Sequence, residues 1–299
     1  MGDDPRWPRA SAWLAGKHES DPVARLSVLG VPLHIASISP SRADLAPEAI
    51  RTALERFSVW DGEADLRRVA AEDLGDLDLA DASPEQALHP VVQRMGTASE
   101  LTAWTLLGGD NSIARPGVHG LGVPLERVGL LTLDAHFDLR DTDAGLRNGN
   151  PVRALLEDGL PGTNVVQVGI QPFANSPAYA EIAREAGITS IPADEVRARG
   201  ASTVVSEALE QLADRADAIY VDLDVDVLDR AFAPACPGAR PGGLRPDEVQ
   251  AAARTCGRHP LVRAIDVVEV DPAQDIAGTT VLTAASFLLA FAAGLAARS

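Results

Sequence analysis

A carboxylate, an imidazole and a second carboxylate stand at alternate positions where one apolar run of the chain ends. Residues 129–138 read GLLTLDAHFD and place Asp134, His136 and Asp138 in this pattern. Alternate side chains of an extended strand share one face, so these three groups can converge on one point. Carboxylate and imidazole groups that converge in this way can bind a metal ion. Taken alone, the same spacing also occurs at an ordinary turn after a strand.

A second run repeats the pattern with carboxylates only. Residues 219–229 read IYVDLDVDVLD and place Asp222, Asp224 and Asp226 on one face of another predicted strand. Clustered carboxylates beside a buried strand repel one another unless they are protonated or neutralised by cations. The two runs together offer more carboxylates than one divalent ion can use. Mostly carboxylate ligands with a single histidine suit manganese better than zinc, so we predict two Mn²⁺ ions.

Two further apolar runs end in polar residues, but neither predicts a site by itself. Residues 106–112, LLGGDNS, are typical of a glycine turn that leads into a helix N-terminus. Residues 265–272, IDVVEVDP, place Glu269 after a predicted strand. An isolated carboxylate at that position is an ordinary feature of a strand end.

Alternating β-branched and helical patterns predict strands joined by helices and hence a parallel sheet. The predicted strands span residues 26–33, 127–133, 165–170, 219–223 and 261–270, and the predicted helices span residues 47–57, 84–99, 178–186, 202–215, 245–258 and 279–297. We expect a three-layer αβα fold with a mostly parallel central sheet, as one domain over residues 1–299 with an N-terminal extension over residues 1–24. The proline- and glycine-rich loop 233–243 should border a site at the carboxyl ends of the strands.

Composition restricts the partners. The chain has 43 acidic and 26 basic residues among 299, a formal net charge of −17, which disfavours nucleic acid and anionic membranes and favours a small-molecule substrate. The spacing of Cys236 and Cys256 supports neither a disulfide framework nor a thiolate zinc site, and no secretory leader is evident, so we expect a cytoplasmic protein. The apolar stretch 281–297 is shorter than the roughly 20 residues that a bilayer needs, which predicts a buried helix.

The four runs, in this order and spacing, resemble the ureohydrolase superfamily of arginase, agmatinase, formimidoylglutamase and their relatives. The likeness covers residues 26–292 or so. It implies an arginase-like fold and hydrolysis of a guanidine or amidine C–N bond by a hydroxide that bridges two manganese ions. It also implies that Asp134 and Asp224 bridge both ions, Asp138 binds the first ion and orients the hydroxide, and His136 and Asp226 bind the second.

Asn111 stands where the superfamily has its remaining metal-binding histidine. An amide oxygen is a weaker ligand than imidazole, so we expect the first ion to be held less firmly. In this respect the chain resembles the Nω-hydroxy-L-arginine amidinohydrolase of D-cycloserine biosynthesis, which implies conversion of Nω-hydroxy-L-arginine to L-ornithine and hydroxyurea. The alternatives are a catalytically silent binding protein of the same fold and a single-zinc deacylase, which would not need Asp226.

The resemblance also implies the substrate contacts. Glu269 would hold the guanidinium or amidine and act in catalysis, and Asn148 and Asn150 occupy the region where arginase has a proton-shuttling histidine. Residues 134–140 and 168–176, DAHFDLR and VGIQPFANS, are similar to formimidoylglutamase. The alternative reaction is therefore conversion of N-formimidoyl-L-glutamate to L-glutamate and formamide, with Arg140 or Arg153 on a carboxylate. Without the C-terminal tail of arginases, a monomer is expected.

Overall fold

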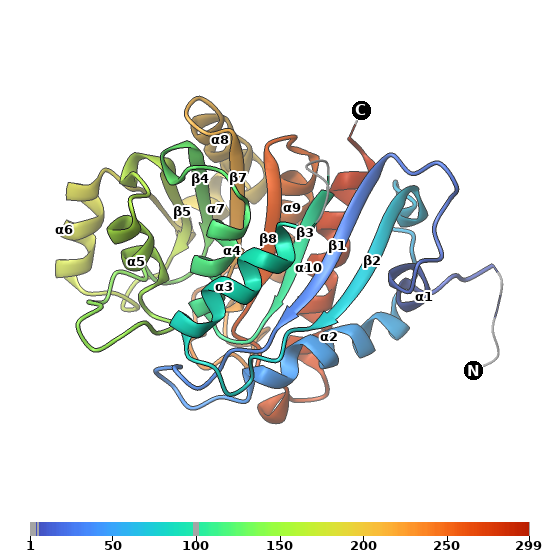
Figure 1. Cartoon of the computed structure of the whole chain (residues 1–299), viewed down its shortest axis with the longest axis horizontal. Coiled ribbons are helices and arrows are strands. Elements are labelled where there is room, and N and C mark those ends of the chain that lie inside the picture. The colour runs from blue at the N-terminus through green and yellow to red at the C-terminus, as the bar shows by residue number, and fades with distance from the viewer. Residues whose placement is uncertain (1–3, 5, 98–101, 299) are drawn as a thin grey trace.

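A single sheet of eight parallel strands runs through the molecule (Figure 1). The computed structural model describes residue 4, residues 6–97 and residues 102–298. Within these residues the strands are β1 (Ala24–Val31), β2 (Val69–Asp76), β3 (Thr102–Gly108), β4 (Val128–Leu133), β5 (Val165–Ile170), β6 (Thr189–Pro192), β7 (Ala218–Leu223) and β8 (Val262–Val267). Their order across the sheet is β2-β1-β3-β8-β7-β4-β5-β6, and every neighbouring pair is parallel.

Helices cover both faces of the sheet, because parallel strands need crossover connections and their buried faces must be covered. One face carries α2 (Ala46–Ala53), α7 (Ala193–Arg199), α8 (Ala201–Ala213), α9 (Pro246–Arg258) and α10 (Thr279–Ala296). The other carries α3 (Pro84–Met95), α4 (Ala114–Gly120), α5 (Pro151–Asp158) and α6 (Pro177–Ala186). Two separate apolar cores result, one on each face. The predicted αβα architecture is confirmed.

The predicted N-terminal extension is partly packed against the domain. Helix α1 (Ala10–Leu14) buries Trp13, whose indole Nε1 donates a hydrogen bond of 2.9 Å to the carbonyl oxygen of Val69 at the start of β2. Buried indole N–H groups need such a partner. This segment therefore covers the core beside the edge strand β2.

All five predicted strands are present, whereas β2, β3 and β6 were not predicted. Strand β2 reads VAAEDLGD and β6 has only four residues, and both are partly exposed edge strands without an apolar run. The short helices α1, α4, α5 and α7 were also missed. The predicted helix 84–99 ends at Met95 as α3, and its residues 98 and 99 lie outside the described residues.

Helix α10 is the buried helix predicted near the C-terminus. By length and composition it could cross a membrane, but 67% of its apolar window is buried in the protein, as expected for a core helix. It crosses α9 where Gly257 and Gly294 meet, so that the two backbones approach closely. A Cβ atom added to Gly294 would meet the Arg254 carbonyl oxygen and the Gly257 backbone.

We expect Gly294→Ala to lower the free energy of unfolding by about 1–3 kcal/mol, because backbone atoms of α9 cannot move aside as a side chain can. Urea unfolding monitored by circular dichroism measures this change. Gly120→Ala is the matched control, since its added methyl would meet only the flexible Met95 side chain. Equal losses of unfolding free energy in the two variants would contradict the idea that the close approach of the α9 and α10 backbones requires glycine.

Candidate metal centre

Four neighbouring strands at the centre of the sheet, β3, β8, β7 and β4, position the predicted site residues. Asn111 follows β3, Glu269 follows β8, Asp224 follows β7 and Asp134 follows β4. The Asp224 backbone N–H donates a 3.1 Å hydrogen bond to the carbonyl oxygen of Leu133. The two acidic segments, 90 residues apart in sequence (224 minus 134), therefore lie side by side at the carboxyl edge of the sheet.

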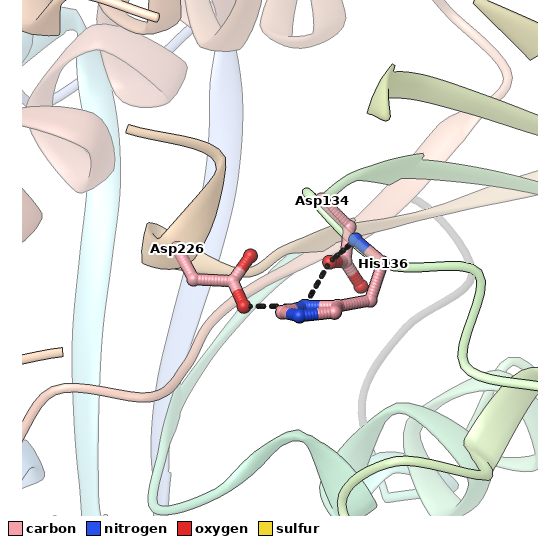
Figure 2. Close-up of side chains that lie close together, drawn as sticks. All are labelled: Asp134, His136 and Asp226. Atoms are coloured by element: carbon pink, nitrogen blue, oxygen red, sulfur yellow. Dashed lines mark hydrogen bonds and ion pairs between the residues drawn. The ribbon is translucent and has the colours of Figure 1, made fainter. Parts of the chain in front are cut away.

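Asp134, His136 and Asp226 form the tightest group at this edge (Figure 2). His136 Nδ1 lies 2.7 Å from Asp226 Oδ2 and 3.5 Å from Asp134 Oδ1. One ligand atom from each residue lies within 4.8 Å of the others, and both carboxylates are buried. The predicted convergence of the two acidic runs is confirmed for these three residues.

Asn111 and Asp138 lie together beside this group. The Asn111 amide Nδ2 donates a hydrogen bond of 2.6 Å to Asp138 Oδ2. Asn111 Oδ1 and Asp134 Oδ2 are buried and have no hydrogen-bond partner among the described residues. Buried polar atoms almost always have partners, and oxygen atoms of this kind are ligands that Mn²⁺ accepts. The donor set therefore fits metal ions, and Asn111 can offer its oxygen as a ligand.

The carboxylates of the site oppose their own ionisation when no cation is bound. Burial and the nearby Asp226 raise the pKa of Asp134 to about 7. Burial, followed by neighbouring carboxylates, raises the pKa of Asp138 and of Asp224 well above the ordinary value. Burial also acts on Asp226, but contact with the His136 imidazole lowers its pKa overall. A divalent cation would relieve this repulsion, because it favours the ionised form of every one of these groups.

Glu269 lies beside the metal ligands and has two hydrogen-bond donors on one oxygen. Its Oε1 accepts from the Asn111 backbone N–H at 2.8 Å and from the Asn148 amide Nδ2 at 2.9 Å. Burial and the charge of Asp110 raise its pKa to about 8, despite these bonds. The Asn148 Oδ1 in turn accepts from the Ile38 backbone N–H at 2.9 Å. Glu269 is therefore held in one orientation and can accept hydrogen bonds from a cationic amidine.

The site opens into a cavity of about 360 Å³. Asp138, Phe173 and Glu269 line it and have positive φ angles of 52°, 63° and 66°. Non-glycine residues rarely adopt such angles, and they cluster at functional sites. The mouth carries Arg140 and Arg240, and the predicted contribution of loop 233–243 is confirmed.

The structure brings some predicted substrate contacts to the cavity but not others. Asn148 lines it, whereas Asn150 does not. The Asn150 amide instead donates to the carbonyl oxygens of Asp141 and Gly145, which gives it a role in holding its own loop. Arg153 also lies outside the lining and pairs with a glutamate of its own helix at 2.6 Å.

Sequence reasoning missed Arg240 and the anchoring role of Asn175. The Asn175 side chain accepts from the Phe137 backbone N–H and donates to the Ala135 carbonyl oxygen, both at 2.9 Å. It thus ties the loop after β5 to both sides of His136. The only signal was the FANS motif after a predicted strand, which does not reveal what the asparagine contacts.

The comparisons with known proteins agree with this architecture. Formimidoylglutamase of Bacillus subtilis is 36% identical over 271 residues, covering 88% of this chain and 85% of that protein. Its crystal structure has a TM-score of 0.91 to this chain at 32% identity and covers 100% of this chain and 95% of that one. Formimidoylglutamase of Halalkalibacterium halodurans is 37% identical over 279 residues, covering 91% of this chain and 88% of that protein.

Trypanosoma cruzi formiminoglutamase, solved with Mn²⁺, shares the fold at a TM-score of 0.87 and 23% identity, over 98% of this chain and 100% of that one. Fold and site thus define a hydrolase with a metal-binding group at the carboxyl edge of a parallel sheet. The arginase family pattern matches residues 24–294, so this chain belongs to the arginase family, whose enzymes hydrolyse guanidino and amidino groups.

The metal-free protein should lose stability as pH rises from about 5 to about 8. The pKa of Asp134 is raised to about 7 and that of Glu269 to about 8, so the native state holds protons that the unfolded state releases near pH 4. The pKa of His136, raised to about 11 by its carboxylate partners against the effect of burial, acts in the same direction. Urea unfolding of chelator-treated protein at several pH values measures the slope.

Glu269→Gln should make this fall in stability smaller, because it removes one of the raised carboxyl groups. Saturating Mn²⁺ should reverse the trend, since metal ligands bind in their deprotonated forms. A metal-free protein that is equally stable at pH 5 and pH 8 would contradict the proton-holding role of the buried carboxyl groups.

Proposed function

We propose that this chain hydrolyses N-formimidoyl-L-glutamate to L-glutamate and formamide. The observation that carries the proposal is the charge layout of the cavity. Every described acidic residue of its lining is a buried group of the floor: Asp138, Asp224, Asp226 and Glu269. The mouth carries guanidinium groups instead.

This layout matches an amidine that carries carboxylates and no free ammonium group. In N-formimidoyl-L-glutamate the amino nitrogen is part of the amidine. The amidinium would therefore be the single cationic group at the negative floor, and only the carboxylates would lie at the mouth. Arginine-type substrates have an α-ammonium group at the far end, and the described mouth residues offer it no carboxylate. The similarity to formimidoylglutamases at 36% and 37% identity supports the same choice.

Arg140 is the residue we assign to a substrate carboxylate. Its side chain packs over Gly149, where a Cβ atom would come within 2.9 Å of the arginine Cδ. No hydrogen bond or ion pair occupies its guanidinium among the described residues, so the group is free to bind an anion. A guanidinium binds a carboxylate through two parallel hydrogen bonds, which also fixes the orientation of the substrate.

The residues of the floor have complementary tasks in the proposed reaction. Bound manganese, two ions by the donor set, would supply a water of lowered pKa near neutral pH. Asp138 would orient the attacking water, and Glu269 would accept hydrogen bonds from the amidinium. Asn148 donates a hydrogen bond of 2.9 Å to Oε1 of Glu269 and so helps to orient this carboxylate. Because the Glu269 charge attracts a cationic amidinium and the attacking water would come from the metal ions, we place the amidine carbon between Glu269 and the metal ligands.

Hydrolysis of Nω-hydroxy-L-arginine, expected from Asn111, remains the second candidate. It rests on the amide at that metal-ligand position, whereas the two relatives at 36% and 37% identity are formimidoylglutamases and support the first reaction.

A manganese-loaded assay should give the highest kcat/KM with N-formimidoyl-L-glutamate, compared with Nω-hydroxy-L-arginine, L-arginine and agmatine. Glutamate, ornithine and putrescine are measured as products. The missing carboxylate at the mouth should weaken every substrate with a free ammonium group. A preference for Nω-hydroxy-L-arginine would reject the proposal in favour of the second candidate.

Glu269→Gln should reduce kcat/KM by roughly 100-fold or more, because a preorganised charge at the reacting group typically contributes that much. Glu181→Gln is the matched control, since Glu181 is exposed on α6 and pairs only with Arg184. Manganese content, measured in both variants, separates loss of metal from loss of amidine binding. A Glu269 variant with full activity would exclude the assigned role.

A further inference from the structure

We propose that Arg240 selects dianionic substrates by binding a second carboxylate, the one that Arg140 does not reach. This inference rests on the proposed function and deepens it. Sequence reasoning gave Arg240 no role, because it lies in the proline- and glycine-rich loop 233–243. The structure places its side chain in the cavity lining, on a different loop from Arg140.

The loop that carries Arg240 is fixed directly onto the metal centre. Gly238 packs against Asp226 so closely that a Cβ atom there would overlap the carboxylate. The Arg240 carbonyl oxygen accepts from the Arg230 backbone N–H at 3.1 Å, and Asp229 Oδ2 accepts from the Gly242 backbone N–H at 2.7 Å. The loop is therefore held by backbone hydrogen bonds to residues 229 and 230, and it packs on Asp226, a carboxylate that would hold a metal ion.

The guanidinium of Arg240 has no carboxylate partner among the described residues. Its Nη1 donates to the Gly238 carbonyl oxygen at 2.5 Å and lies 3.2 Å from His136 Nε2. The edge formed by Nε and Nη2 thus remains available for a carboxylate. In a protein of net charge −17, a guanidinium that faces a cavity without an acidic neighbour is suited to an anionic ligand.

The contact with His136 fixes the side of the imidazole on which the guanidinium lies. His136 Nδ1 faces Asp134 and Asp226, whereas Nε2 faces Arg240. The Arg240 guanidinium therefore lies across the imidazole ring from these two buried carboxylates.

Two guanidinium groups at one mouth suit a substrate with two carboxylates. N-formimidoyl-L-glutamate has an α- and a γ-carboxylate, and each can form a paired hydrogen bond with one arginine. Removing one carboxylate from the substrate should then make one arginine unnecessary. This gives a test in which the substrate and the residue are changed together.

The test compares wild type, Arg240→Met and Arg240→Lys with three amidines. N-formimidoyl-L-glutamate is dianionic, N-formimidoyl-L-glutamine lacks the γ-carboxylate, and N-formimidoyl-4-aminobutyrate lacks the α-carboxylate. Arg240→Met should lower kcat/KM for the dianion at least tenfold, mainly by raising KM. For the monoanion that lacks the carboxylate bound by Arg240, kcat/KM should stay within twofold of the wild-type value. Arg240→Lys should recover part of the loss. An equal loss for all three amidines, or no loss for the dianion, would overturn the proposal.

Ligand binding gives a readout that is independent of turnover. Isothermal titration of L-glutamate into the manganese-loaded proteins should show weaker binding to Arg240→Met than to the wild type. Arg245→Met, which removes an exposed arginine paired with Asp247, should bind L-glutamate as tightly as the wild type does. Metal content is measured in each variant.

The two hypotheses can fail separately. If the wild type does not hydrolyse N-formimidoyl-L-glutamate, the proposed reaction is wrong, and the titrations still decide whether Arg240 binds a carboxylate. If the wild type hydrolyses it but Arg240→Met binds L-glutamate as tightly as the wild type does, the role of Arg240 is wrong and the reaction stands.

Discussion

Repulsion among buried carboxylates is the constraint on which this structure depends. The sheet places Asp134 and Asp224 on adjacent strands, and burial leaves them little water for solvation. Backbone N–H groups offset part of the repulsion: those of His136, Asp226 and Ala135 donate to Asp134, Asp224 and Asp226, respectively. Each carboxylate can nevertheless accept more hydrogen bonds than these backbone N–H groups donate. A fold that keeps these groups together therefore depends on cations or protons for its charge balance.

The same region contains three of the four non-glycine residues that have positive φ angles in the described part of the chain, with Ala277 as the exception. Asp138 and Glu269 adopt left-handed conformations in the segments that follow the central strands β4 and β8. Such conformations persist only when the surroundings hold them. Here the Asn111 backbone N–H and the Asn148 side-chain amide donate hydrogen bonds to Glu269. The Asn111 side-chain amide donates one to Asp138. Backbone strain, buried charge and hydrogen bonds are thus concentrated in one place, and the hydrogen bonds hold the strained and charged residues in position.

The sequence was most informative about where the central strands end. The apolar runs of β4 and β7 were enough to predict that Asp134, His136 and Asp226 come together at the carboxyl edge of the sheet. The premise of strand alternation was wrong, because His136 lies after β4 and Asp226 lies in the 3-10 helix Val225–Val227. Loops offer even less regular geometry. Asn148 and Asn150 are two positions apart, yet one reaches Glu269 and the other binds its own loop. Arg240 and Asn175 were missed for the same reason, because their contacts depend on how two loops fold over the sheet edge. The edge strand β2, with its acidic and glycine residues, lacks the apolar run that reveals the central strands.

The division between sheet and loops also separates the chemistry from the choice of substrate. The metal-binding carboxylates and Glu269 follow the central strands, whereas Arg140, Phe173 and Arg240 come from three different loops. A change in a loop can alter the charge at the mouth without moving the buried floor, because the floor is fixed by the strand register. Gly238 shows where the two parts meet: its missing side chain lets the Arg240 loop rest on Asp226. Any residue larger than glycine at that position would move the loop or the carboxylate, so substrate selection and metal binding are coupled through one backbone contact.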